Sequence, residues 1–337
     1  MIRRFLVGAA LAVAIAAVPA QSRAAEVDAL LPAETEFVVF FNTRQMLDSE
    51  LTKKFALGQI KQVLDGADAK KMVEKLGVDP LKDIDRVTVG AWGKDKDDGS
   101  ALFVIRGKFD PVKLFEAAEA EAKANADKMS IVKEGGRTLV KFTADNQPKP
   151  VYISVATEGA EGKEKYSIVG ASDKKLVIDA MAAAEKGTKA ALKKELAALV
   201  LKQDEKASMF ACGVVDGKIE GLPPGVNIPG VDSAKLGKQL EKMSSISMTL
   251  RLAGDVNLEI TMGMKDEAAA DDFGGTLGQL IETAKNLLPL VAGQQPQFKP
   301  LADEVAKTLV SKIKDKEVTL TVKLSGDSIG KATGGGD

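Results

Sequence analysis

Residues 256–264 read VNLEITMGM, an alternation of apolar and polar side chains that decides the fold class. One side of such a strand carries Leu258, Ile260, Met262 and Met264, and the other carries Asn257, Glu259 and Thr261. Residues 317–324, EVTLTVKL, alternate in the same way. Because a period of two places one strand face on a core and the other in water, the sequence predicts an α+β fold of antiparallel sheet covered by helices on one face.

A repeated order of elements extends from this stretch through the chain. In the first half we expect a strand at 37–41, a helix at 69–76, a hairpin of 86–92 and 101–106, a helix at 111–126, and closing strands at 151–155 and 166–169. In the second half we expect a strand at 209–215, a helix at 234–243, a hairpin of 245–252 and 256–264, a helix from about 267, and a closing strand at 318–324. We interpret this order as two related β-α-β-β-α units, residues 25–187 and 188–326, with a flexible tail over 327–337.

Residues at the expected helix ends agree with this interpretation. Asp110 can cap a helix that begins at Pro111, because its carboxylate can accept hydrogen bonds from the first backbone N–H groups. Proline suits the first helical position, because the N–H group that it lacks would be unpaired there. A late helix is predicted to begin at Pro300 and to end near Lys312 and Lys314, whose charges suit the negative end of the helix dipole.

The amino-terminal residues have the three parts of a secretory signal peptide. Arg3 and Arg4 supply the positive start, residues 5–18 are apolar, and a polar exit follows. Small side chains suited to the peptidase predict cleavage between Ala24 and Ala25. A retained membrane anchor is the alternative, but the apolar run is shorter than the roughly 20 residues that span a bilayer. We therefore expect a protein exported to the periplasm or the extracellular space.

Two further observations bear on this address. A second possible cleavage site follows Ala20, where small residues also precede the scissile bond. Beyond the leader no apolar run is long enough to span a bilayer, since residues 287–292 are short and contain Pro289, so we expect no transmembrane segment after leader removal.

Composition excludes several classes of function. The chain has 47 Lys and Arg against 48 Asp and Glu, and loss of three leader arginines leaves a mature net charge of −4, which argues against nucleic acid as a partner. The absence of histidine removes it as general base, metal ligand or pH switch. Cys212 is the only cysteine, so no internal disulfide or thiolate cluster can form, and we expect a buried, inert thiol. No catalytic, cofactor-binding or metal-binding residue is assigned, and we expect no enzyme.

Two sets of residues are candidate metal sites. Asp95, Asp97 and Asp98 could suit calcium, but the motif is incomplete and a solvated hairpin tip is favoured. A soft-metal thioether site is a second possibility, for which core filling is the favoured interpretation. Its methionines would be Met209, Met248, Met262 and Met264.

Two apolar features have open interpretations. Trp92 shares a strand side with Thr88 and Gly90, so it is a possible surface contact for a partner, although a second packed layer would bury it equally well. The amphipathic stretch 188–202 could bind a membrane surface or a partner, but packing against its own sheet is the commoner fate of such a face.

The chain resembles a broad group of uncharacterised exported bacterial proteins that share a domain of unknown function. The resemblance lies in four short segments, LLPA at 30–33, LGVDP at 76–80, GKFD at 107–110 and ASD at 171–173. It implies an exported protein with two related units, and it implies no catalytic residues.

These observations favour a periplasmic or cell-envelope binding or structural protein without catalytic activity, whose partner is an unknown envelope protein. The alternative is a carrier of an apolar small molecule held between sheet and helices, because the inner strand faces are rich in Leu and Met. A histidine-free hydrolase is a third hypothesis.

Overall fold

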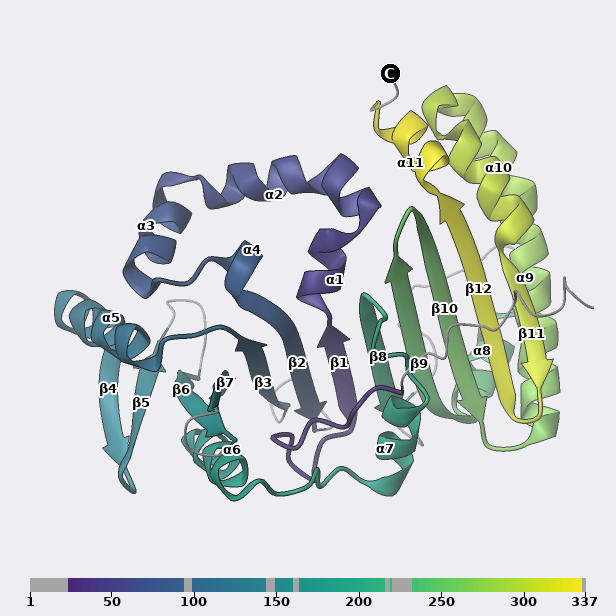
Figure 1. Ribbon diagram of the computed structural model, residues 1–337. Helices are drawn as coiled ribbons and strands as arrows, with labels where there is room; N and C mark the ends of the chain where they lie inside the picture. The colour runs from purple at the N-terminus through teal and green to yellow at the C-terminus, as the bar shows by residue number, and fades with distance from the viewer. Residues whose placement is uncertain are drawn as a thin grey trace, which may run out of the picture.

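The computed structural model describes residues 24–93, 99–143, 149–159, 164–215, 219 and 232–334. Its strands are β1 (Phe37–Phe41), β2 (Ile84–Trp92), β3 (Ser100–Gly107), β4 (Met129–Glu134), β5 (Arg137–Phe142), β6 (Val151–Glu158), β7 (Lys165–Ala171), β8 (Met209–Val214), β9 (Met243–Leu252), β10 (Asp255–Met264), β11 (Val310–Lys314) and β12 (Glu317–Ser325). They form one antiparallel sheet in the order β11-β12-β10-β9-β8-β1-β2-β3-β7-β6-β5-β4 (Figure 1). The α+β class with antiparallel strands is therefore confirmed.

Helices connect these strands. They are α1 (Thr43–Asp48), α2 (Leu57–Leu64), α3 (Ala67–Leu76), α4 (Pro80–Asp83), α5 (Pro111–Ala124), α6 (Lys174–Lys186), α7 (Lys194–Leu201), α8 (Ser233–Leu240), α9 (Glu267–Gln294), α10 (Lys299–Thr308) and α11 (Gly326–Thr333). A π-helical stretch, Thr52–Ala56, leads into α2, and a short 3-10 helix, Pro296–Phe298, precedes α10.

The pairing of β1 with β8 makes the sheet continuous between the two halves of the chain. Val39 lies opposite Ala211 in this antiparallel pair. One position along, the rings of Phe40 and Phe210 stack with their centroids 4.8 Å apart. Strands on either side of β1 and β8 therefore share one hydrogen-bonded ladder rather than forming two separate sheets.

The larger core lies on the face of the sheet that carries Val38 and Phe40, called here the front face. Helices α6 and α7 cover it, in front of the strands in Figure 1. Strand β3 shows the effect of this cover, because Leu102 and Val104 are 1% and 0% exposed while their neighbours Phe103 and Ile105 remain partly exposed. The alternation along the strand thus separates a packed face from a less packed one.

The second core lies on the opposite, back face, between β9, β10 and β12 and helices α8 and α9 (Figure 1). Met262 and Val318 contribute to it from neighbouring strands, and Phe273 contributes from α9. The front face of these strands is polar, with the hydroxyl oxygens of Thr261 and Thr319 3.2 Å apart. The covered face therefore switches from front to back between the two halves of the sheet.

Most of the expected elements are present. The hairpins β2–β3 and β9–β10 form as predicted. Helix α5 begins at Pro111, and the Asp110 carboxylate accepts hydrogen bonds from the backbone N–H groups of Val112 (3.0 Å) and Lys113 (3.3 Å). Helix α3 is followed by Gly77, whose φ is 63°. A residue with a Cβ atom would be strained at this positive φ, and glycine has none.

The late helix is shorter than predicted. Helix α10 ends at Thr308, and Lys312 and Lys314 lie in β11, so the prediction that they close the helix is wrong. Residues 310–314 instead pair with β12 through a turn at Asp315, where φ is 52°. The hydrogen bonds of this hairpin stabilise the chain more than the lysine charges would stabilise a longer helix. The expected flexible tail from 327 also differs, because α11 occupies most of its described part.

A hairpin absent from the sequence prediction forms the far edge of the sheet. Strands β4 and β5 are joined by Gly135 and Gly136, both with positive φ (58° and 78°). Two consecutive glycines between segments in which apolar and polar residues alternate are a typical sequence signal of a β-hairpin.

Two sequence predictions lie outside the described residues. They are the apolar leader at 1–23 and the acidic turn that contains Asp95, Asp97 and Asp98.

Candidate functional site

A helical arch, residues 43–83, connects β1 to β2 and contains α1 to α4 (Figure 1). One foot of the arch is fixed to the second half of the sheet, because the side-chain amide of Gln45 donates to the carbonyl oxygen of Leu252 at 2.6 Å. The backbone N–H of Leu51 donates to the carbonyl oxygen of Ala253 at 3.1 Å. The first helix is thereby held in place on the β9–β10 turn.

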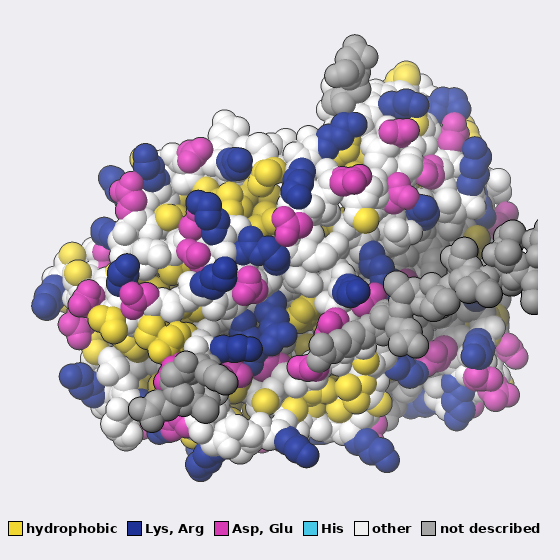
Figure 2. Space-filling model, viewed as in Figure 1, with side chains coloured by type: hydrophobic (Ala, Val, Ile, Leu, Met, Phe, Trp, Pro, Cys, Tyr) yellow, Lys and Arg dark blue, Asp and Glu magenta, His cyan; other side chains and the backbone are white. Residues whose placement is uncertain are grey.

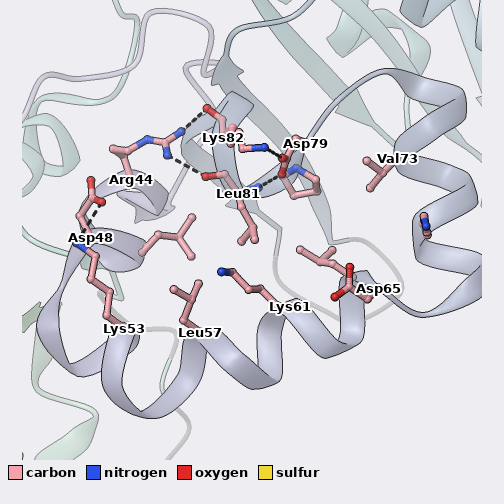
Figure 3. Close-up of a pocket in the computed structure, with 14 residues that line it drawn as sticks. Arg44, Asp48, Lys53, Leu57, Lys61, Asp65, Val73, Asp79, Leu81 and Lys82 are labelled. Carbon is pink, nitrogen blue, oxygen red and sulfur yellow. Dashed lines mark hydrogen bonds and ion pairs between the residues drawn. The ribbon is translucent and has the colours of Figure 1, made fainter.

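Arg44 ties the two feet of the arch together. Its guanidinium donates to the carbonyl oxygens of Leu81 (2.8 Å) and Lys82 in α4 (Figure 3). It also donates to the carbonyl oxygen of Ile84, the first residue of β2, at 3.4 Å. It also lies 3.6 Å from the carboxylate of Asp85. These bonds and the nearby Asp85 hold the guanidinium against α4 and the start of β2, so Arg44 braces the arch.

A cleft of about 490 Å³ lies beneath the arch. Six aliphatic or proline side chains from all four helices line it: Leu47, Leu57, Leu64, Val73, Pro80 and Leu81. Figure 2 shows hydrophobic side chains gathered in this region and bordered by charged groups. This volume falls within the range of about 300–1,000 Å³ that is typical of small-molecule sites.

The apolar lining of this cleft is not used up by packing within the protein. Helices α1, α2 and α4 contain no fully buried residue, and all six apolar lining residues are partly exposed. Apolar surface left in contact with water is unfavourable by roughly 25 cal/mol per Å². A ligand with a hydrocarbon part would therefore gain free energy by occupying the cleft.

Charged groups surround the cleft, and most of them are already paired. The cations are Arg44, Lys53, Lys61, Lys70 and Lys82, and the acids are Asp48, Asp65 and Asp79. Lys53 lies 3.6 Å from Asp48, and Lys82 lies 2.8 Å from Asp79. The hydrogen bond from Lys82 lowers the pKa of Asp79, and the same bond raises the pKa of Lys82. Both members of that pair are thus charged at neutral pH.

Lys61, like Lys70, forms no ion pair with any carboxylate whose position the structure describes. It extends from α2 into the cleft (Figure 3). Sequence reasoning missed this group, since it assigned only residues 69–76 of the arch to a helix. The helical spacing of Leu57, Ile60 and Leu64 was a signal that could have revealed α2.

Trp92 is half-buried and packs against the front-face core. Part of its side chain stays exposed, so its role as a surface contact stays a prediction. It lies on β2, opposite Ser100 of β3, and does not line the cleft.

Cys212 and two of the four methionines proposed for a soft metal lie in the cores, whereas Met209 and Met248 are partly exposed and belong to neither core. Cys212 is 0% exposed on β8, and burial raises the pKa of its thiol to about 12. Met262 and Met264 belong to the back-face core, which agrees with their interpretation as core residues. Leu196 and Val200 of the amphipathic stretch are 0% and 2% exposed in the front-face core, so this stretch packs on its own sheet.

The described residues hold no cluster of three or more His, Cys, Asp or Glu side chains arranged to bind a metal ion. Within the same part of the chain, no helix combines the length and the apolar character required to cross a bilayer.

A second apolar surface lies on the back face of the first half of the sheet, called here the first-half back face. It comprises Phe37, Val39, Phe41, Val87, Val89, Phe103, Ile105, Ile153, Val155 and Ile168. None of the ten belongs to either core cluster, and each is partly exposed. Contiguous apolar surface of this kind is a feature of interaction sites.

The residues expected at the signal cleavage site begin the described chain. Ala24 forms an isolated β-bridge with Asp204, and the backbone N–H of Ala25 donates to the carbonyl oxygen of Gln203 at 2.8 Å. Ala25 is 3% exposed. The chain is thus part of the fold from this point.

No protein-family model, no curated protein and no solved structure matches this chain, so the cleft beneath the arch is identified by its geometry and chemistry alone.

Proposed function

We propose that this chain is an exported binding protein of the bacterial envelope, that it catalyses no reaction, and that it carries a small molecule with a large apolar part. The cleft beneath the arch is the observation that carries the proposal. Its six partly exposed apolar side chains come from four helices. None of the six belongs to either core cluster, so they are available to a ligand. The leader at the amino terminus supports the address, because a signal peptide directs the chain out of the cytoplasm.

Native mass spectrometry of the mature protein, purified without detergent from cells that export it, tests this function. We expect a species heavier than the bare chain, because a hydrocarbon ligand removes the cleft lining from water. Leu57→Asp places a carboxylate in the lining and should abolish the added mass. Val63→Asp is the matched control, since Val63 lies on the same helix, is 72% exposed and does not line the cleft.

The result is decisive in both directions. A wild-type protein that shows only its bare chain mass, and that binds none of a panel of alkyl compounds, contradicts the carrier function. An added mass that survives Leu57→Asp places the ligand elsewhere and contradicts the assignment of the cleft.

A second candidate function is the binding of an envelope protein, and the first-half back face favours it. In the second half of the sheet, the amphipathic helix α9 covers the same face. The first half would accept an amphipathic helix of a partner in the same way. Cross-linking in whole cells tests this idea with Ile105→Lys, which should abolish a specific adduct, and Lys186→Ala as the control on the opposite side. A wild-type protein without any adduct contradicts it.

We also propose that the two halves are related units, residues 25–187 and 188–326. The support is topological, because β8-β9-β10-β12 are connected and ordered like β1-β2-β3-β7. An experimental structure in which these two strand sets superpose, with their connecting helices on corresponding paths, would agree. Sets that superpose only in reversed order would contradict it.

A further inference from the structure

The charges of the cleft beneath the arch identify the class of ligand more closely, and this inference rests on the carrier function proposed above. Arg44 is occupied by three backbone carbonyl oxygens. Asp48 and Asp79 are neutralised by Lys53 and Lys82. Two cations, Lys61 and Lys70, and one acid, Asp65, then remain without an ion pair to a described residue. Among the described lining residues, the charge left for a ligand is therefore positive.

Lys61 is placed to use this charge within the apolar part of the cleft. It comes from the same helix as Leu57 and Leu64, and its side chain extends toward the interior of the cleft rather than away from the arch (Figure 3). Lys61 is exposed at the cleft, so an anion can reach its ammonium group, and an alkyl chain bound beside it would shield the resulting ion pair from water and strengthen it. A neutral or cationic ligand would leave this charge without a partner.

We propose that the ligand is a single-chain anionic amphiphile, whose carboxylate or phosphate group pairs with Lys61 while its alkyl chain packs on the leucines of the cleft. Phosphate and carboxylate share the chemistry that a lysine recognises, a compact negative charge with oxygen acceptors. The cleft volume of about 490 Å³ accommodates one alkyl chain and its head group.

Isothermal titration calorimetry with four decyl compounds tests the proposal on the full mature chain. The compounds are decanoate, decyl phosphate, decanol and decyltrimethylammonium, which share one alkyl chain and differ in the head group. We expect both anions to bind at least about 5-fold more tightly than decanol, and decyltrimethylammonium to bind most weakly. The preference for the anions should shrink in about 1 M NaCl, because salt screens a partly exposed ion pair. The tighter of the two anions indicates whether the natural head group is a carboxylate or a phosphate.

Lys61→Gln removes the charge while keeping a long side chain and good helix propensity. We expect it to remove the preference for the anions and to leave the affinity for decanol unchanged. Lys71→Gln is the matched control, because Lys71 is exposed on α3 and does not line the cleft. Circular dichroism verifies that both variants are folded.

The outcomes separate the two proposals. Equal binding of decanoate and decanol, or an anion preference that persists in Lys61→Gln, overturns the assignment of Lys61, while Leu57-dependent binding of decanol still supports the carrier function. Failure of all four compounds to bind, together with a bare chain mass, overturns both.

Discussion

Arg106 on β3 holds the carboxylate of Asp28 with two of its guanidinium nitrogens, one of them 3.0 Å from a carboxylate oxygen. Glu158 on β6 accepts from the same guanidinium at 3.2 and 3.3 Å. Burial opposes the charge of Arg106, but the two carboxylates outweigh it and raise the pKa of this side chain. This ion-pair network fastens the amino-terminal segment, with the buried Leu30 and Leu31, to the front face of the sheet.

Arg106→Met should therefore destabilise the protein by about 3–5 kcal/mol, because Asp28, only 7% exposed, would keep a buried charge without a partner. The free energy of unfolding in urea, followed by the fluorescence of Trp92, measures the change. Lys75→Met is the control, since its pair with Glu121 is exposed and such pairs contribute about 0–1 kcal/mol. Equal losses in the two variants would contradict the structural role of the network.

The same segment makes the start of the mature chain testable. We expect cleavage between Ala24 and Ala25, so that the new amino group of Ala25 retains its hydrogen bond to the carbonyl oxygen of Gln203. The intact mass of the exported protein measures this directly. A mature chain that starts at Gln21 would favour the second cleavage site, and a protein that retains Met1 would contradict export with cleavage.

Cys212 should make stability depend on alkaline pH. The folded state holds the thiol protonated up to about pH 12, whereas in the unfolded chain it loses its proton near its ordinary pKa of 9.0. This contribution is complete below pH 9 and is lost progressively as the pH rises toward 12, because the unfolded state gains by releasing the proton. At pH 10.5 the loss amounts to about 2 kcal/mol relative to pH 8.5.

Free energies of unfolding at these two pH values, for the wild type and Cys212→Ala, measure the effect. Lysine and tyrosine titrate in both proteins, so their contributions cancel in the comparison. We expect a smaller loss in the variant. Identical losses would show that the thiol does not contribute.

The strands could largely be predicted from sequence because their pattern is local. Alternation in 256–264 and 317–324 identified two central strands, and Asp110 with Pro111 marked the start of α5. The switch of the covered face could not be predicted, since it depends on the pairing of β1 with β8, two segments about 170 residues apart. The position of β11 depends on a different effect, its local hairpin with β12 across the turn at Asp315, which competes with a sequence that also suits a helix end.

The cleft was beyond sequence reasoning for a related reason. Each helix of the arch contributes one or two apolar residues, and no local pattern shows that Leu47, Leu57 and Val73 meet around one space. The sequence around Lys61 likewise does not distinguish it from an ordinary surface lysine, because its position in the cleft depends on how the helices of the arch pack. Only the composition of the inner strand faces, rich in Leu and Met, pointed toward an apolar ligand, and those strand residues proved to fill the cores instead.

Gly107 provides a test of how the arch is seated on the sheet. A Cβ at this position would lie 1.8 Å from the carbonyl oxygen of Asp83 at the end of α4, an oxygen that accepts a hydrogen bond from Lys108 at 2.7 Å. Gly107→Ala must therefore move backbone against backbone, and we expect a loss of about 2–4 kcal/mol in the free energy of unfolding.

Gly275→Ala is the opposite case and serves as the control. Gly275 is exposed within α9, and a Cβ there would meet no atom within 4 Å. Its replacement should stabilise the protein by about 0.5–1 kcal/mol, because alanine loses less backbone entropy than glycine in a helix. Since α4 also lines the cleft, Gly107→Ala should in addition weaken decanoate binding, whereas Gly275→Ala should leave it unchanged. If Gly107→Ala lowers the free energy of unfolding but leaves decanoate binding unaltered, the cleft tolerates a shift of α4. That result would contradict the idea that the close contact of α4 with β3 determines the shape of the site.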